Sequence, residues 1–378
     1  MTSEVRKLGM PKWGLSMTEG RLVEWLVDEG ADIAVGDEVA EVETDKLNGP
    51  VESPVAGVLR RRVASPGETI PVGGLLGVVA EAGVADADVD AFVAEFQAAF
   101  VPGESEEDAG PEPETVRVPA GTLRYLRQGE GPDAVVLLHG FGGDLNNWLF
   151  AAPALAQGHA VYSLELSGHG GSSKAVGPGD LDFFVDAVVQ FLDELDLGHV
   201  HLVGHSLGGL VAASLALRDP QRARSLTLVA SAGLGEEING DYLEGFISAG
   251  SRRELKPALE LLFADSGQVT RQLVDDVLRY KRIDGVDAAL RAIADQVFGD
   301  GRQHVILADR LGDLGVPVLV VWGERDRIIP PEHARHVPDG AEVHVLEGSG
   351  HSPHMEAPGD VNRVMEAFFA QAGRSPAG

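Results

Sequence analysis

Over the first eighty residues, glycines separate short segments in which apolar and polar positions alternate, and this pattern occurs twice. Three glycines recur at an offset of 37 residues: Gly20 with Gly57, Gly30 with Gly67, and Gly36 with Gly73. Five apolar positions keep that offset: Leu22 with Leu59, Ile33 with Ile70, Val35 with Val72, Val39 with Leu76, and Val42 with Val79. Alternation without helical periodicity predicts short strands joined by glycine turns. Two such halves predict an all-β domain over residues 1–83, a flattened sandwich of two antiparallel sheets.

Beyond residue 115 the pattern changes to continuous apolar runs separated by helical spacing. Strands are predicted at Ala134 to His139, Val161 to Leu164, Val200 to Gly204, Leu226 to Ala230, Val316 to Trp322 and Glu342 to Leu346. Continuous apolar runs are typical of strands buried on both faces of a parallel sheet. Residues 181–197 have helical spacing between two of them. We therefore expect residues 115–374 to form an α/β domain, a mostly parallel sheet with helices on both faces.

Residues 232–305 interrupt this sheet between two strands. They are helix-rich, with an apolar cluster at Leu255, Leu259, Leu262 and Phe263. We expect a helical cap that covers the site and shapes an acyl pocket, and ordinary core packing is the alternative for each of these residues.

Residues 84–114 connect the two domains. Five apolar positions follow helical spacing from an Asp-rich start: Val89, Phe92, Val93, Phe96 and Phe100. This predicts a short amphipathic helix that packs on one of the two domains, with partner binding as an alternative. Residues 102–114 are acidic, contain Pro and lack large apolar side chains, which predicts an extended linker. At about 3.1 Å per residue such a linker spans about 40 Å.

Composition narrows the classes of function. A formal net charge of −29 argues against binding to nucleic acid or to anionic membranes. Because there are no cysteines, disulfides, Cys-ligated zinc and a thiol nucleophile are excluded. The first residues lack the apolar region of a signal peptide, and no run approaches 18 apolar residues. We therefore expect a cytoplasmic protein.

A serine nucleophile is predicted at Ser206. Residues 204–208, Gly-His-Ser-Leu-Gly, directly follow a predicted strand and precede a helix-forming stretch at residues 210–217. Gly-x-Ser-x-Gly in this context is typical of a nucleophile elbow, where a strained turn exposes the hydroxyl group above the sheet.

The base and its orienting carboxylate are predicted further along the chain. Asp326 follows one predicted strand and His351 follows the next, so both lie at the carboxyl edge where α/β sites assemble. The order Ser206, Asp326, His351 is the one expected for an α/β hydrolase. The backbone N–H groups of Phe141 and Leu207 are predicted to form the oxyanion hole. Residues 115 to about 372 thus resemble the α/β-hydrolase superfamily.

The remaining histidines are interpreted without a metal. The pairs at 333 and 336 and at 351 and 354 have a spacing that suits a metal, but no cysteine or carboxylate constellation accompanies them. His139 and His205, which lie beside the predicted site, are interpreted as structural or supporting residues. Residues 167–171, Ser-Gly-His-Gly-Gly, do not match the dinucleotide-binding pattern.

Lys46 is the predicted attachment point of a carrier group. It follows Glu-Thr-Asp in a predicted hairpin turn between the two β halves. A lone exposed lysine is usually only solvated, but this turn, the 37-residue symmetry and Ser-Pro-Val-Ala-Gly at 53–57 resemble the lipoyl domains of 2-oxoacid and acetoin dehydrogenase complexes. Biotinyl domains are similar in fold but place their lysine between methionines, whereas Asp45 and Leu47 flank it here. The resemblance implies lipoate linked to Lys46 on a swinging arm.

A lipoyl domain joined to an α/β-hydrolase domain resembles the acetyltransferase components of acetoin dehydrogenase complexes. This resemblance implies acetyl transfer from lipoyl-Lys46 to coenzyme A, by way of Ser206 activated by His351 and Asp326. It also implies two partners, a thiamine-diphosphate enzyme that cleaves acetoin and a flavin dihydrolipoyl dehydrogenase, and assembly as a homo-oligomer.

The chain departs from other lipoyl acyltransferases in two respects. It has no His-x-x-x-Asp-Gly motif, and no peripheral-subunit-binding domain is evident between residues 84 and 115. Two alternatives therefore stay open: a carboxylesterase or thioesterase tethered by its lipoyl domain, and a carrier or scaffold with an idle hydrolase-like domain.

Overall fold

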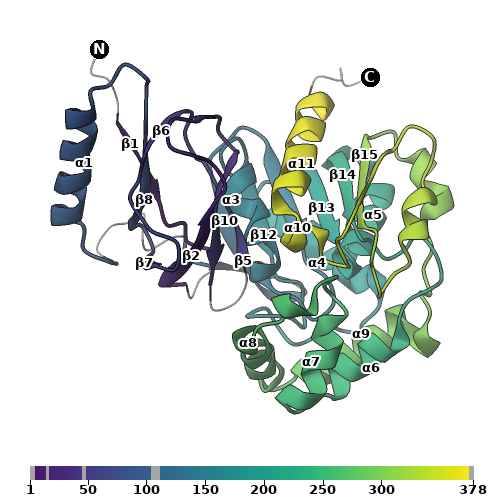
Figure 1. Cartoon of the computed structure of the whole chain (residues 1–378). Coiled ribbons are helices and arrows are strands. Elements are labelled where there is room, and N and C mark those ends of the chain that lie inside the picture. Colours follow the sequence, from purple (N-terminus) through teal and green to yellow (C-terminus); the bar gives the residue numbers. More distant parts are fainter. Residues whose placement is uncertain (1–4, 14–16, 45–47, 104–110, 374–378) are drawn as a thin grey trace. The chain divides into compact units, whose positions relative to one another are not determined.

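The computed structural model describes residues 5–13, 17–44, 48–103 and 111–373. Lys46 lies outside these described residues. The chain divides into two compact units, Met1–Pro111 and Glu112–Gly378 (Figure 1). No helix in the described part of the chain is long and apolar enough to cross a membrane.

The first unit contains two antiparallel sheets of four strands. One has the order β1 (Arg6–Gly9), β8 (Leu75–Ala80), β6 (Gly57–Arg62) and β3 (Asp32–Ile33). The other has the order β5 (Asn48–Glu52), β4 (Glu38–Glu43), β2 (Glu19–Trp25) and β7 (Thr69–Pro71). Each sheet takes strands from both sequence halves, and the two sheets enclose one apolar core. The predicted all-β sandwich is confirmed.

The sequence repeat is also a repeat of hydrogen bonds. The Gly30 N–H donates to the Leu59 carbonyl at 2.7 Å, and the Gly67 N–H donates to the Leu22 carbonyl at the same distance. Gly30 and Gly67 both have a φ of 89°, a left-handed conformation that favours glycine. The offset of 37 residues therefore relates equivalent turns.

A helix, α1 (Asp86–Ala99), packs on the first unit. Val89 is fully buried against Leu75, Val78 and Ala80 of β8. Arg60 donates to the carboxylate of Asp86 at 2.7 Å, which fixes the start of the helix. The sequence left open which domain carries this helix, and the structure assigns it to the β domain.

The second unit is built on an eight-stranded sheet. Its order is β16 (Glu342–Leu346), β15 (Val318–Gly323), β14 (Ala223–Val229), β13 (Val200–His205), β11 (Ala134–Leu138), β12 (Ala160–Leu164), β10 (Gly121–Gln128) and β9 (Glu114–Val118). The pairs from β16 to β12 are parallel, and β10 pairs antiparallel with both β12 and β9. β9 begins at Glu114, so the predicted linker extended one residue too far.

Helices cover both faces of this sheet. On one face α3 (Ala151–Leu155) and α11 (Pro358–Ala372) pack against alternate strand residues such as Val135, Val203 and Leu319. α5 (Leu207–Arg218) packs on β13, β14 and β11, with α4 (Leu181–Glu194) beside it. α10 (Pro353–Glu356) and short 3₁₀ turns at Leu145–Trp148, Pro220–Arg222, Ala308–Asp313 and Pro331–Arg335 complete the layers.

Four helices form the predicted insertion between β14 and β15: α6 (Gly240–Ser248), α7 (Arg252–Glu260), α8 (Arg271–Lys281) and α9 (Val286–Val297). Short 3₁₀ turns lie at Ser266–Gln268 and Gly299–Gly301. The four helices lie together at one end of the strands (green in Figure 1). All of them contain buried apolar residues, and α6 and α8 each pack against both α7 and α9.

Candidate active site

Ser206 stands between β13 and α5 with a strained backbone. Its φ is 52° and its ψ is −117°, a combination that side chains other than glycine rarely adopt. A Cβ atom on Gly204 would lie 2.3 Å from the Gly208 carbonyl oxygen, and one on Gly208 would lie 2.2 Å from the Leu138 carbonyl oxygen. The turn thus requires glycine two residues before and two residues after the serine, as in a nucleophile elbow.

Asp326 and His351 meet on the loops that follow β15 and β16. The Nδ1 atom of His351 donates to Oδ2 of Asp326 at 2.8 Å, and both side chains are buried. The other oxygen of Asp326 accepts from the N–H groups of Ile328 at 2.8 Å and Ile329 at 3.0 Å. These donors hold the carboxylate in place, and it in turn orients the imidazole with Nε2 directed away from it.

His205 connects the elbow with the histidine loop. Its Nε2 atom donates to the His351 carbonyl oxygen at 2.9 Å, and the two ring centroids lie 4.9 Å apart. Burial lowers the pKa of His205 well below its usual value, and the rings of His354 and His351 lower it further. Neutral His205, which directly precedes Ser206, therefore links the elbow to the loop that carries His351.

The segment that carries Phe141 lies directly against Ser206. A Cβ atom on Gly140 would be 2.8 Å from Nδ1 of His205 and 3.1 Å from the Cβ atom of Ser206, so glycine permits this close approach. Leu207 is the first residue of α5, where a backbone N–H has no partner within the helix. The two predicted oxyanion donors thus belong to segments that border the serine.

His139 shapes the same segment. Its Nε2 atom accepts from the Leu166 N–H at 3.0 Å, so the proton is on Nδ1, which donates to the Gly140 carbonyl at 2.8 Å. Burial lowers the pKa of His139, which keeps the ring neutral. The contacts agree with the interpretation of His139 as a supporting residue.

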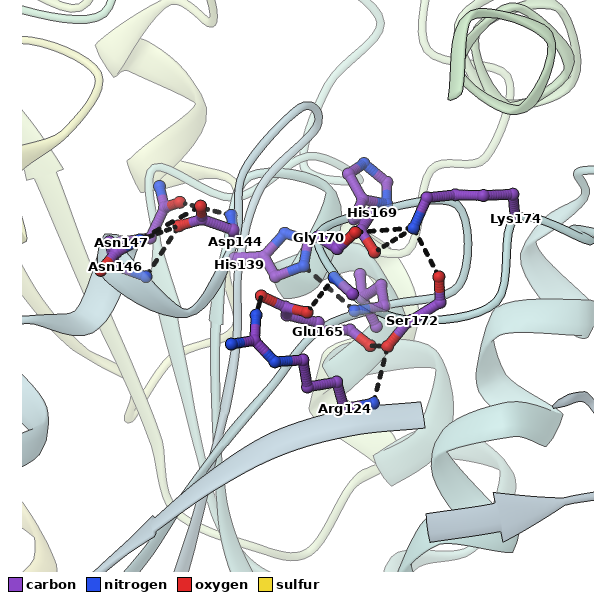
Figure 2. Close-up of polar contacts among 12 residues, drawn as sticks. Arg124, His139, Asp144, Asn146, Asn147, Glu165, His169, Gly170, Ser172 and Lys174 are labelled. Atoms are coloured by element: carbon purple, nitrogen blue, oxygen red, sulfur yellow. Dashed lines mark hydrogen bonds and ion pairs between the residues drawn. The ribbon is translucent and has the colours of Figure 1, made fainter. Parts of the chain in front are cut away.

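The sequence did not predict one buried carboxyl group, that of Glu165, which directly precedes the residue whose N–H donates to His139. Glu165 follows β12 and accepts from Arg124 Nη1 at 3.2 Å and from the Gly171 N–H at 2.5 Å (Figure 2). Burial, together with the nearby charge of Asp144, raises the pKa of Glu165 to about 7. A Cβ atom on Gly170 would collide with this carboxyl group. Gly170 therefore allows the loop of residues 167–171 to close around Glu165.

Lys174 stabilises the same loop from its far end. Its ammonium group donates to the carbonyl oxygens of Gly170 at 2.6 Å and Ser172 at 2.5 Å, and Figure 2 shows the side chain turned toward them. The only sequence signal for this loop was its richness in glycine.

The predicted carrier site can be followed only to its edges. β4 and β5 pair antiparallel, and their last pair is Glu43 with Asn48, both exposed. Lys46 belongs to the short connection between these strands, and residues 45–47 lie outside the described residues. A hairpin whose described edges are exposed fits a site that a modifying enzyme must reach.

The histidines at 333 and 336, one of the two pairs considered for a metal, have other partners. His333 contacts the carboxylate of Glu237 at 2.9 Å, and His336 donates to the Leu234 carbonyl at 2.8 Å. A separate group at the other end of the sheet brings together donor atoms of Asp133, His159 and His201.

Asp133 in that group already forms an ion pair with Arg224 at 2.8 Å. The absence of a metal therefore stays a prediction from the sequence.

Family models match both units. A biotin-requiring enzyme model covers residues 6–79, and an alpha/beta hydrolase fold model covers residues 133–358. Among solved structures, a meta-cleavage product hydrolase from Pseudomonas fluorescens IP01 has a TM-score of 0.63 at 23% identity, covering 68% of this chain and 98% of that one. The class is therefore a lipoyl-type domain joined to an α/β-hydrolase domain.

Curated relatives narrow this class. The dihydrolipoyllysine-residue acetyltransferase component of the acetoin cleaving system from Pseudomonas putida is 52% identical, over 97% of this chain and 99% of the relative. Its counterpart from Cupriavidus necator is 49% identical, over 94% and 95%. The chain belongs to the family of dihydrolipoyllysine-residue acetyltransferase components of acetoin cleaving systems, which confirms the resemblance found in the sequence.

Proposed function

We propose that this chain transfers an acetyl group from lipoate on Lys46 to coenzyme A, and that Ser206 carries the acetyl group between them. The observation that supports this most strongly is the buried pair of Asp326 and His351, which His205 links to the strained serine elbow. That pair occurs in a chain whose other unit has the lipoyl-type fold.

The first half of the reaction acylates the serine. His351 Nε2 takes the proton from the Ser206 hydroxyl group while the oxygen attacks the carbonyl carbon of the acetyl thioester. The N–H groups of Phe141 and Leu207 stabilise the negative charge that forms on the carbonyl oxygen. When the carbon–sulfur bond breaks, His351 returns the proton to the departing sulfur, and an acetyl ester remains on Ser206.

The second half repeats these steps in the opposite direction. The thiol of coenzyme A gives its proton to His351 and attacks the ester carbonyl, after which His351 protonates the Ser206 oxygen as it leaves. Asp326 keeps its charge throughout and stabilises the imidazolium that forms twice in the cycle.

Lys46 would hold the lipoyl group in an amide bond. The group, when attached, supplies the acetyl unit as a thioester on a long arm, and attachment to the same chain raises its effective concentration at the second unit.

The relatives' names place them in an acetoin cleaving system. On that basis we extend the proposal to a thiamine-diphosphate enzyme and a flavin dehydrogenase as partners, to a cytoplasmic location and to a homo-oligomer.

The choice of acceptor tests this function against simple hydrolysis. S-Acetyl-dihydrolipoamide is offered to the full chain with and without coenzyme A, and acetyl-CoA and free acetate are measured. The proposal predicts that acetyl-CoA dominates with coenzyme A present, whereas dominant acetate would assign the chain to the esterases or thioesterases. If Ser206→Ala leaves acetyl-CoA formation unchanged and a serine-directed phosphonate fails to label the wild type, the hydrolase-like unit is idle.

A further inference from the structure

The peptide unit between Phe141 and Gly142 is held at both of its polar ends by side chains from other parts of the fold. The hydroxyl group of Tyr242, on cap helix α6, donates to the Phe141 carbonyl oxygen at 3.3 Å. The Gly142 N–H donates to Nε2 of His169 at 3.1 Å, on the loop after β12. Both side chains are buried, so water does not compete well for either bond.

His169 can accept this hydrogen bond only when its ring is neutral. Burial lowers the pKa of His169 well below its usual value, and the nearby ring of His139 lowers it further. Nδ1 of His169 donates to the Ser167 carbonyl at 3.1 Å, which leaves the lone pair on Nε2 for Gly142. The Ser167 carbonyl, on the loop that closes around Glu165, thus fixes the His169 tautomer with its proton on Nδ1.

The preceding peptide unit, between Gly140 and Phe141, is held by its carbonyl oxygen. That oxygen accepts from His139 at 2.8 Å and from the Gly143 N–H at 3.1 Å. In a trans peptide the N–H points away from the carbonyl, so these bonds also direct the Phe141 N–H. Because the peptide units on both sides of the Phe141 Cα atom are held, φ and ψ of Phe141 have little freedom.

The cap itself is tied down where Tyr242 acts. Lys281 at the end of α8 is buried, and it donates to the Ile247 carbonyl of α6 and to Asp287 of α9, each at 2.9 Å. Phe246 of α6 lies so close to Gly142 that a Cβ atom there would be 2.4 Å from its ring. Helix α6 is therefore held in place and packs directly against the peptide unit between Phe141 and Gly142.

We infer that Tyr242 and His169 are positioning residues for the oxyanion hole, which hold the Phe141 N–H toward the reacting carbonyl oxygen. This inference rests on the proposed function, because it assigns Phe141 to that hole. The cap then contributes to catalysis through the Tyr242 hydroxyl group as well as through the substrate pocket it was expected to shape. Preorganised donors stabilise the transition state more than the substrate, so loosening one lowers kcat and leaves KM little changed.

Single variants test the two ends of the peptide. Removing a whole oxyanion donor lowers kcat by about 10² to 10³, so Tyr242→Phe and His169→Leu, which only loosen one, should each lower kcat for p-nitrophenyl acetate by about tenfold. His169→Gln keeps an acceptor near the Nε2 position and should recover most of the loss. The double variant should lose less than the product of the single losses, because both side chains hold one peptide.

A tetrahedral boronate adduct separates this role from a general structural one. For each variant of the full chain, the affinity for phenylboronic acid should fall by the same factor as kcat, with KM unchanged. Tyr125→Phe is the matched control, since it removes a buried tyrosine's bond to Glu114 on the sheet edge. Thermal unfolding of each variant is followed alongside, and the isosteric Tyr242→Phe covers the case in which His169→Leu fails to fold.

Three results would overturn the inference: wild-type kcat and boronate affinity in Tyr242→Phe, a rise in KM with kcat unchanged, or no recovery in His169→Gln. Ser206→Ala identifies a failure of the proposed function instead. If Ser206→Ala keeps wild-type activity, the site is not the one proposed. If it is inactive while Tyr242→Phe is normal, only the positioning role is lost.

Discussion

At the scale of single residues, glycines and buried histidines determine the geometry around Ser206. Gly140, Gly204 and Gly208 each stand where a side chain would meet backbone or the serine itself. The sequence predicted Ser206, Asp326 and His351 because each follows a strand. It could not predict Tyr242 and His169, because their bonds to the oxyanion segment join residues 101 and 27 positions apart.

The contact of Gly208 with β11 predicts a severe effect of Gly208→Ala. Its methyl group would lie 2.2 Å from the Leu138 carbonyl oxygen, so helix α5 would have to move away from the sheet. We expect a loss of about 1–3 kcal/mol in the free energy of unfolding by urea, and loss of esterase activity. Gly198→Ala is the control, since a Cβ atom there would meet nothing within 4 Å. Equal stability of the two variants would contradict the packing described here.

Buried neutral histidines predict a loss of stability in acid. Burial lowers the pKa of His201 to about 3, and the neighbouring His159 adds to this. Between this pKa and the pKa of about 6.5 in the unfolded chain, His201 is protonated in the unfolded chain but not in the native one. The free energy of unfolding therefore falls as the pH falls.

His201→Gln should therefore reduce the slope of unfolding free energy against pH by about 1.4 kcal/mol per unit. Urea unfolding between pH 4 and pH 6 measures this slope, and the exposed His304 supplies the control substitution His304→Gln. A slope unchanged in His201→Gln would mean that His201 is protonated in the folded protein.

At the scale of elements, the repeat located the strands of the first unit well. β4 and β8 begin and end 37 residues apart, which is the offset found in the sequence. The antiparallel strands β9 and β10 were not predicted, because their half-buried patterns resemble surface segments. The packing of α1 was left open for a related reason: an amphipathic pattern shows which face is buried but not what covers it.

The docking of α1 on β8 can be tested with one buried charge. Val89 is fully buried there, so Val89→Asp should detach the helix and raise the hydrogen-exchange rates of the α1 amides in the full chain. Exchange in β2 and β4 should stay slow. Ala94→Asp, on the exposed face of the same helix, is the control, and α1 amides that stay protected in Val89→Asp would exclude this packing.

At the scale of the whole molecule, the sequence alone already indicated two units with different tasks, a carrier and a serine enzyme. The connection between the units was predicted only from its composition. Which thiol finally accepts the acetyl group depends on contacts that neither sequence pattern nor backbone topology specifies.

The most direct test of the account is to find the acetyl group on Ser206. The full chain is mixed with S-acetyl-dihydrolipoamide, and samples are quenched in acid before and after coenzyme A is added. Each sample is digested, and the mass of the peptide that contains Ser206 is measured by mass spectrometry. The account predicts an acetylated Ser206 that disappears with coenzyme A while an equal amount of acetyl-CoA forms. Two results together would contradict it: Ser206→Ala produces acetyl-CoA at the wild-type rate, and the Ser206 peptide of the wild-type chain carries no acetyl group at any time.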